Sequence, residues 1–355
     1  MRRSGSQPPC TRASLTSPHD PVSSSASAAT LGIDIGGTKV ESALVDASGT
    51  IQARHRHPTD RDQGAGRVLD EVVRCVNECL SQSASEAAAA GVGVAGQVDS
   101  EAGVVRSAPN LGWTDVPLQS RLEEALGLPV TVANDVRAVT WGVWRHGAGR
   151  DISDLVVVFV GTGIGGGVVS GGEVLQGHQG LAGELGHTMI MPYGRACHCR
   201  NRGCWEAYAG GWALEERAQE AVRTDPEAGA ALLEKAGGDV DDITGRSVHA
   251  AFEEGDPLAK RLVGATAEYL GLGLVGIVNT FNPERVVLGG GMIEGHPGYV
   301  DGAQRIVQRR ALGPAVADLE VVAADLGGQA GVVGAATMAR AASRESESRP
   351  AAPAC

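Results

Sequence analysis

The stretch LGIDIGGTKVESALVD, residues 31–46, places two short apolar segments on either side of a turn with two glycines. Its first segment is typical of a strand that ends in glycines, and VESALVD alternates like the strand that returns beside it. The same device occurs again at residues 154–175, where DLVVVFVG is followed by TGIGGGVVSGGEVL. Two hairpins of one style, one in each half of the chain, indicate a duplicated fold that holds a nucleotide between its halves.

Strands and helices alternate around these two hairpins. We expect an α/β protein, because apolar residues recur with strand periodicity and with helix periodicity in turn. Beyond the hairpins, the expected strands are residues 49–57, 89–99, 129–135, 285–291 and 319–327. The expected helices are residues 66–80, 136–149, 258–280, 299–311 and one that begins at Gly331.

Length and composition limit the classes of function. A chain of 355 residues has room for two domains, and 43% hydrophobic with 20% charged residues is typical of a globular protein. A formal net charge of -12 and an aromatic content of 3% provide no basic surface and few stacking platforms for nucleic acid. We therefore expect no nucleic-acid partner.

Both ends of the chain have low complexity. Residues 1–29 are rich in Ser, Pro and Ala without the apolar segment of a secretory signal, so a disordered tail is expected. An organellar transit peptide, or a start codon assigned too early, fits the same composition. Residues 344–355 form a second expected tail. No uninterrupted apolar run of about 18 residues occurs, so we expect no membrane span, and a cytoplasmic protein with reduced thiols.

Three glycine-rich turns, each directly after an expected strand, point to phosphate binding. In DIGGTK, Gly36 and Gly37 lack side chains, so backbone N–H groups can approach an anion. Asp34 beside them can hold a hydrated Mg²⁺ ion. GTGIGGG at residues 161–167 and LGGGM at residues 288–292 repeat the pattern. Any one of these runs is also an ordinary tight turn, and none matches the P-loop or the dinucleotide fingerprint.

The strand that ends in Asn134 and Asp135 supplies a candidate base. A carboxylate at a strand tip can accept the proton of a sugar hydroxyl that attacks the γ-phosphorus of a nucleotide. The alternative is a helix N-cap, because Asn and Asp both favour that position and a helix follows. Asn110 in SAPNLGW is equally ambiguous, since Asn-Leu-Gly after Pro is also an ordinary turn.

The segment ELGHTMIMPYGRACHCRNRGCWE, residues 184–206, contains four soft ligands in the spacing H-x9-C-x-C-x4-C. The candidate metal ligands are His187, Cys197, Cys199 and Cys204. They can close a tetrahedral Zn²⁺ site, which is structural because no coordination position stays open. Free thiols are the alternative; a disulfide needs an oxidising compartment that nothing in the sequence supports. His198 can replace one cysteine as a ligand.

The chain resembles the ROK family of sugar kinases and repressors from about residue 31 to 340. The motifs that carry the resemblance occur in the family's order: DIGGTK, VAND, GTGIGGG, AGELGH, CHCRNRGCWEAYAGG, LGGGM and AGVVGAA. It implies an actin-like, hexokinase-type two-domain ATPase fold with duplicated ribonuclease-H-like domains. The implied parts are a small α/β domain of residues 30–145 plus 328–343 and a large α/β domain of residues 146–327 with a zinc loop at 187–204.

Carried over residue by residue, the resemblance implies a general base at Asp135 and a sugar contact at its neighbour Asn134. Further sugar contacts are implied for Asn110, Glu184, His187 and Glu206. The phosphate motifs fall on Asp34, Gly36, Gly37, Thr38, Lys39, Gly161, Thr162 and Gly163, and the adenosine region on Gly289, Gly290 and Gly291. ATP, Mg²⁺ and a structural Zn²⁺ are the implied cofactors, and a dimer or tetramer is the implied assembly.

Two positions depart from the family pattern. Arg200 stands in the zinc loop where glycine is common, which affects the local turn and leaves all three thiols in place. Ala95-Gly96 replaces the usual Pro-Gly on the sugar side, so that loop is expected to be softer.

The expected reaction is transfer of the γ-phosphoryl group of Mg-ATP to the 6-hydroxyl of glucose, because PNLGW with the intact E-x-G-H and CWE most resembles the glucose-phosphorylating members. Kinases of N-acetylmannosamine, N-acetylglucosamine or fructose share most contacts and are the alternatives. A repressor is disfavoured because about 30 residues without helical periodicity precede the first motif. A zinc hydrolase needs an open coordination position, and a polyphosphate donor a more basic channel.

Overall fold

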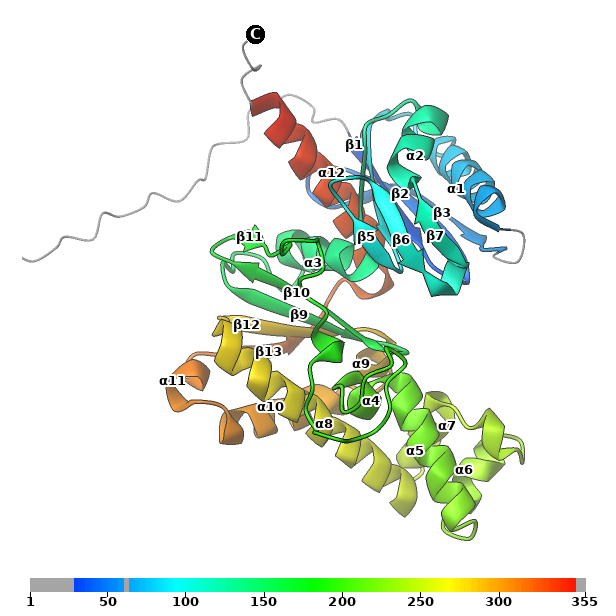
Figure 1. Cartoon of the computed structure of the whole chain (residues 1–355), viewed down its shortest axis with the longest axis vertical. Coiled ribbons are helices and arrows are strands. Elements are labelled where there is room, and N and C mark those ends of the chain that lie inside the picture. Colours follow the sequence, from blue (N-terminus) through cyan, green and yellow to red (C-terminus); the bar gives the residue numbers. More distant parts are fainter. Residues whose placement is uncertain (1–28, 61–63, 349–355) are drawn as a thin grey trace, which may run out of the picture.

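The computed structural model describes residues 29–60 and 64–348. Within them, two five-stranded sheets each form the centre of one half of the molecule, and helices cover the sheets (Figure 1). The N-terminal tail predicted for residues 1–29 lies outside the described residues, except for Ala29, which opens the first strand.

The first sheet confirms the meander predicted around residues 31–57. Its strands are β1 (Ala29–Ile35), β2 (Lys39–Val45), β3 (Ile51–Pro58), β4 (Ala87–Val94) and β8 (Val130–Asn134). They lie in the order β3-β2-β1-β4-β8. Central β1 pairs antiparallel with β2 and parallel with β4, which pairs parallel with β8. The parallel strands end on one edge, which carries Asp34 at the end of β1 and Asn134 at the end of β8.

A separate small sheet extends the first half, and the sequence pattern did not predict it. It consists of β5 (Gln97–Asp99), β6 (Val104–Ala108) and β7 (Trp113–Val116), followed by α2 (Leu118–Leu126). The single strand predicted for residues 89–99 is wrong in one respect: it is divided at Ala95 and Gly96 into β4 and β5. Because β5 leaves the central sheet at that point, the small sheet lies beside the end of β4.

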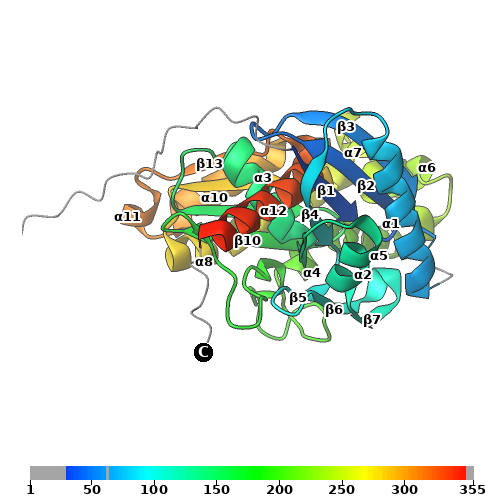
Figure 2. The same ribbon diagram turned by 90° about the horizontal axis from the view of Figure 1, so that it is seen from above.

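Helices cover both faces of the first sheet. α1 (Gly64–Leu80) packs on one face through the apolar stripe predicted from its spacing. α12 (Ala330–Ser348) crosses the opposite face (Figure 2), where Val332 joins one apolar cluster with Ala43 and Val45. The first half is therefore completed by a helix from the far end of the described chain.

The second sheet repeats the first in topology. Its strands are β9 (Leu155–Val160), β10 (Ile164–Ser170), β11 (Glu173–Val174), β12 (Arg285–Gly289) and β13 (Glu320–Ala323). They lie in the order β11-β10-β9-β12-β13, again with an antiparallel hairpin on one side of the central strand and two parallel strands on the other. The predicted duplication is confirmed.

The helices of the second half surround one long apolar helix. The long helix is α8 (Pro257–Phe281). The others are α4 (Glu206–Ala209), α5 (Gly211–Thr224), α6 (Ala230–Lys235), α7 (Gly245–Glu253), α9 (Gly291–Gly295), α10 (Gly298–Arg310) and α11 (Gly313–Val316). By length and composition α8 could cross a membrane, and half of its most apolar window is buried inside the protein. Since α8 packs against α4, α5, α7 and α10, its apolar residues have a role in the core.

Another helix of the first half, α3 (Asp135–His146), lies between the two sheets (Figure 1) and packs on α12 (Figure 2). At their crossing, a Cβ atom on Gly334 would lie 1.7 Å from the carbonyl oxygen of Ala138, and one on Gly142 would lie 2.6 Å from that of Ala330. Only glycine permits this backbone-to-backbone approach. The two helices that connect the halves are thus held in direct contact.

The second tail does not begin where the sequence predicts. α12 continues to Ser348, past the predicted start of the tail at residue 344, because Arg and Glu, which occur there, are good helix formers. Residues 349–355 lie outside the described residues. The domain limits of 30–145 plus 328–343 and 146–327 stay a prediction.

Candidate active site

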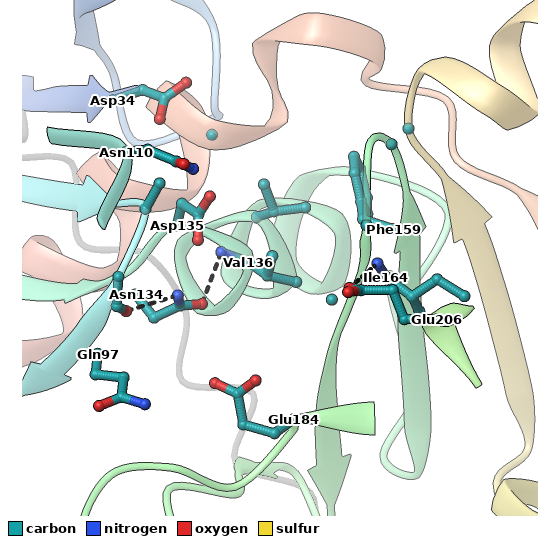
Figure 3. Close-up of a pocket in the computed structure, with 18 of the residues that line it drawn as sticks. Asp34, Gln97, Asn110, Asn134, Asp135, Val136, Phe159, Ile164, Glu184 and Glu206 are labelled. Atoms are coloured by element: carbon teal, nitrogen blue, oxygen red, sulfur yellow. Dashed lines mark hydrogen bonds between the residues drawn. The ribbon is translucent and has the colours of Figure 1, made fainter. Parts of the chain in front are cut away.

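A cleft of about 790 Å³ opens between the two halves (Figure 3). The residues of the predicted site that line it are Asp34, Lys39, Asn110, Asn134, Asp135, Gly161, Gly163, Glu184, His187, Cys199, Glu206, Gly290 and Gly291. Those that do not line it are Gly36, Gly37, Thr38, Thr162, Cys197, Cys204 and Gly289. Residues far apart in the sequence, from both halves, therefore meet at one cavity.

Asn134 is the N-cap of α3. Its Oδ1 accepts hydrogen bonds from the backbone N–H groups of Val136 at 3.0 Å and Arg137 at 3.3 Å. Its Nδ2 donates to the carbonyl oxygen of Gly96 at 3.1 Å. The capping alternative holds for Asn134, and one amide hydrogen is left for a ligand.

Asp135 follows as the first residue of α3, and its carboxylate points into the cleft (Figure 3). Burial raises the pKa of Asp135 above its ordinary value, while hydrogen bonds from the Val136 backbone and the Asn134 side chain oppose the shift. Gly93 lies beneath it, because a Cβ atom there would come within 3.4 Å of the Asp135 Cα. This carboxylate is a stronger base than an ordinary aspartate and faces the space where a substrate would bind.

Asp34, at the end of β1, lies on the same side of the cleft. Burial and then the charge of Asp135 raise the pKa of Asp34 to about 6, against a smaller opposing effect of Lys39. Its carboxylate packs on the start of α12, where a Cβ atom on Gly331 would lie 3.2 Å from Oδ2. Two carboxylates that face one cleft are suited to a bound cation, which would lower both pKa values.

The turn between β1 and β2 is held by close backbone contacts. The N–H group of Gly36 donates to the carbonyl oxygen of Lys39 at 2.9 Å. A Cβ atom on Gly37 would lie 3.0 Å from the carbonyl oxygen of Asn110, so glycine allows this turn to approach the loop that carries Asn110. The Lys39 ammonium is held by Glu41 Oε2 at 3.1 Å. The expected phosphate turn and one expected sugar residue are thereby adjacent.

The turn between β9 and β10 approaches a carboxylate of the second half. The carbonyl oxygens of Gly161 and Thr162 both accept hydrogen bonds, at 3.0 Å, from the first residues of α5. A Cβ atom on Gly163 would lie 2.3 Å from Oε2 of Glu206. Glycine is needed here to leave space for that carboxylate.

The third glycine run follows β12. Gly290 has a φ angle of 93°, in the left-handed region, and a Cβ atom there would lie 2.6 Å from the carbonyl oxygen of Val160. Gly289 packs on the ring of Phe159, whereas the space around a Cβ atom on Gly291 is open. The run lets the backbone border the cleft directly.

Glu184 and Glu206 line the cleft from the second half. Glu206 Oε2 accepts a hydrogen bond from the backbone N–H group of Ile164 at 2.8 Å, and its Oε1 accepts one from Trp212 Nε1 at 3.2 Å. Glu184 lies at the other end of the cleft, in the neighbourhood of Gln97 (Figure 3). The two carboxylates are separated along the cavity, and that of Glu206 is fixed by protein donors.

A compact group of metal-binding side chains lies beside these carboxylates. One ligand atom each from His187, Cys197, Cys199 and Cys204 lies within 4.8 Å of the others. The His187 Nδ1 to Cys197 Sγ distance is 3.7 Å, and the Cys199 Sγ to Cys204 Sγ distance is 3.6 Å. Sulfur ligands on tetrahedral Zn²⁺, with Zn–S bonds of about 2.3 Å, are roughly 3.8 Å apart. The donor set and its spacing therefore fit zinc.

The cysteines of this group are free thiols, with no disulfide among the residues that the structure describes. Burial and the neighbouring thiols raise the pKa of Cys204 to about 12. His198 lies outside the group, because its ring stacks on Trp212 with centroids 4.1 Å apart. Arg200 has a φ angle of 73°, so it adopts the left-handed conformation that favours glycine, the residue common there in the family.

Several residues that line the cleft were not predicted. They are Gln97, Ser107, Phe159, Leu181 and the glycine-rich segment 327–331 at the start of α12. Gln97 directly follows the Ala95-Gly96 departure, and the segment 327–331 overlaps the start of the AGVVGAA motif, residues 330–336. Those two signals could have drawn attention to them; Ser107, Phe159 and Leu181 offer none in the sequence.

Two α/β halves of one topology, with a carboxylate of raised pKa and glycine turns facing each other across one cleft, define a small-molecule phosphotransferase of the sugar-kinase class. The chain belongs to the ROK family, whose model matches residues 30–342. The expected fold and family are confirmed.

Individual relatives cover almost the whole matched region. A glucokinase of Streptomyces coelicolor is 36% identical over 314 residues, which span 88% of this chain and 97% of that protein. An N-acetylmannosamine kinase of Escherichia fergusonii is 34% identical over 314 residues, spanning 88% and 98%. The solved structure of a ROK family glucokinase from Streptomyces griseus, in complex with glucose and AMPPNP, has a TM-score of 0.78 at 36% identity and covers 88% of this chain and 99% of that one. The chain is a sugar kinase.

Proposed function

We propose that the chain transfers the γ-phosphoryl group of Mg-ATP to the 6-hydroxyl of glucose, with Asp135 as the general base. The observation that carries this proposal is the position of Asp135, a carboxylate of raised pKa at the start of α3 that points into the cleft between the halves. The similar glucokinase from Streptomyces griseus was solved with glucose and AMPPNP together, which supports the same pair of substrates here.

Asp135 accepts the proton of the 6-hydroxyl while the sugar oxygen attacks the γ-phosphorus and the bond to the ADP oxygen breaks. Base assistance of this kind contributes roughly 10² to 10⁴ in rate. Asn134 supports the step by capping α3, which holds the first residue of the helix at the cleft.

Charge on the transferred group is offset by the glycine turns and by a cation. We expect backbone N–H groups of two of these turns, at Gly37 and Gly163, to approach the phosphates, because a glycine leaves the backbone uncovered; those of Gly36 and Gly161 donate to carbonyl oxygens of the protein. Asp34 would hold the hydrated Mg²⁺ ion, since its carboxylate faces the cleft beside Asp135. Bound Mg²⁺ supplies neutralisation of the developing phosphate charge.

The sugar is held by amide, carboxylate and imidazole groups of the cleft. They are Asn110, Asn134, Glu184, His187 and Glu206. Because His187 Nδ1 faces the Cys197 thiol, its Nε2 is the atom left for a sugar hydroxyl. Zinc in the neighbouring group would fix that ring and the loop around it, without taking part in the phosphoryl transfer.

A second candidate substrate is N-acetylmannosamine, which the relative from Escherichia fergusonii favours. N-acetylglucosamine and fructose present the same reactive hydroxyl. Polyphosphate is the alternative donor. A homo-oligomer and a cytoplasmic location stay predictions. Light scattering on the purified protein measures its oligomeric state.

A coupled ADP-release assay with wild type and Asp135→Asn tests the proposal. The substrates are glucose, mannose, fructose, N-acetylglucosamine and N-acetylmannosamine, each with ATP and with polyphosphate. We expect the highest kcat/KM for glucose with ATP, and an Asp135→Asn variant that binds glucose in calorimetry but turns over about 10² to 10⁴ times more slowly. An N-acetyl preference would refute the substrate, and near wild-type turnover in Asp135→Asn would refute the base.

A further inference from the structure

Arg137 is a buried cation on the helix that begins with Asp135. Its side chain is only 7% exposed. The guanidinium donates through Nη2 to the carbonyl oxygen of Gly180 and through Nη1 to the Ser100 hydroxyl at 3.5 Å. Among the residues that the structure describes, no carboxylate lies within ion-pair distance of it. A buried guanidinium without a paired carboxylate is costly, so its position calls for a reason.

The electrostatic neighbour of Arg137 is Glu184. Burial lowers the pKa of Arg137, and the charge of Glu184 acts in the opposite direction. Glu184 is one of the two carboxylates that line the cleft from the second half. The charge of Arg137 also attracts the Glu184 carboxylate, whose oxygens can accept hydrogen bonds from sugar hydroxyls.

Gly180 shows that the contact is a close one. It lies in the loop 175–183, which joins β11 to Glu184, and has a φ angle of 70°. A Cβ atom there would lie 3.4 Å from the carbonyl oxygen of Val98 and 3.6 Å from Arg137 Nη1. The loop of the second half therefore rests directly on the first half at this point.

A small cavity of about 70 Å³ behind the sugar end of the cleft has Arg137, Gly180, Asn134 and Glu184 in its wall. Arg137 thus connects two elements that must be in register for a reaction: the start of α3, which carries Asp135, and the loop that leads to Glu184. A misplacement of about 1 Å between such groups can cost on the order of 10²-fold in rate or affinity.

We propose that Arg137 is a positioning residue for the sugar, which holds the loop 175–183 on the first half and directs Glu184 into the cleft. This inference rests on the proposed sugar phosphorylation only in that a hexose must occupy the cleft. It holds for whichever hexose the wild type phosphorylates best.

The test compares Arg137→Met, Arg137→Lys and Gly180→Ala with Arg145→Met as the matched control. Arg145 lies on the same helix, is exposed and does not line the cleft. We expect Arg137→Met to raise the KM for the hexose about tenfold or more, with the KM for ATP changed by less than about twofold. Arg137→Lys should recover part of the loss because its ammonium can still donate to Gly180, and Gly180→Ala should raise the same KM from the loop side.

A hexose KM that stays at the wild-type value in Arg137→Met, as in Arg145→Met, would overturn the proposal even if the melting temperature falls. If Arg137→Met does not fold, unchanged hexose KM values in Arg137→Lys and Gly180→Ala would overturn it equally. A wild type that phosphorylates a hexose other than glucose contradicts the proposed substrate alone, and the variants are then measured with that hexose.

Discussion

At the residue scale, burial in the cleft disfavours the charged form of two carboxylates, Asp34 and Asp135, and raises their pKa values. The raised pKa of Asp34, about 6, means that the folded protein binds a proton there more tightly than the unfolded chain does. The stabilising contribution of that proton is complete below the ordinary value of 3.8 and is lost as the pH rises through about 6. At neutral pH the ionised Asp34 therefore lowers the stability of the protein without its ligands, and a bound cation reverses the effect.

Replacement of Asp34 by asparagine should raise the melting temperature at about pH 7.5, because an amide in this buried position carries no charge. The gain should shrink as the pH falls towards about 4, where the wild-type carboxyl is protonated. Thermal unfolding in metal-free buffer across this range measures the difference. Asp70→Asn, at an exposed position of α1, is the control. A gain that does not depend on pH would contradict the assignment.

At the element scale, the segment between Glu184 and Glu206 contains little regular structure. Its shape depends on the group of His187 and the three cysteines, which lies only three residues from Glu184 and two residues from Glu206. Metal binding can supply the folding free energy that such a segment lacks. A metal group that is expected to contact the sugar only through His187 can in this way determine where two sugar-binding carboxylates lie.

Cys197→Ala should therefore lose the metal and raise the KM for the sugar about tenfold, although no cysteine is expected to contact the sugar. Metal content by mass spectrometry and steady-state kinetics on the same preparation measure both effects. Cys79→Ala, a buried cysteine on α1 outside the group, is the control and should keep its metal. A metal-free Cys197→Ala protein with unchanged sugar affinity would show that the loop does not need the metal.

At the scale of the whole molecule, the two halves meet at the cleft and where α3 of the first half packs on β9 and β10 of the second. Because glycines bring α3 and α12 backbone to backbone, we expect these two helices to move together as one rigid unit. Substrate-binding residues of the two halves can then approach one another when the halves rotate relative to each other. Such closure excludes water, which would otherwise compete with the sugar for the phosphoryl group.

Saturating sugar should decrease the radius of gyration in solution scattering, by on the order of 1 Å, as the halves close. Asp135→Asn should show the same decrease, since it keeps the sugar contacts and loses only the base. An unchanged scattering curve for a protein that binds sugar in calorimetry would contradict closure.

The fold was readable from the sequence where local signals agreed. Each glycine hairpin beside a central apolar strand was recognisable, because strand alternation and turn residues coincide there. The small sheet β5–β7 was missed, since its strands are too short to show a period, and the break at Ala95 was read as continuous strand. Helices α5 to α7 also went unpredicted.

The sequence predicted many residues of the cleft, but not which role each of them has. Asn134 and Asp135 were both ambiguous, and only the hydrogen bonds to Val136 and Arg137 show which of them caps α3. Arg137 carried no signal at all, because its partner Gly180 lies more than forty residues away and contacts it only in the folded molecule. Contacts between distant segments do not leave a local pattern in a sequence.

The position of α12 has a consequence for how the molecule is made. Strands β1, β2 and β4 leave the ribosome early, but one face of their sheet is covered by α12, which begins only at Ala330. During synthesis the apolar side chains Ala43 and Val45 have no native cover, whereas the second half can complete its own core as it emerges. The half that is translated first is thus the one that finishes folding last, and a stalled or truncated chain would expose that face to chaperones.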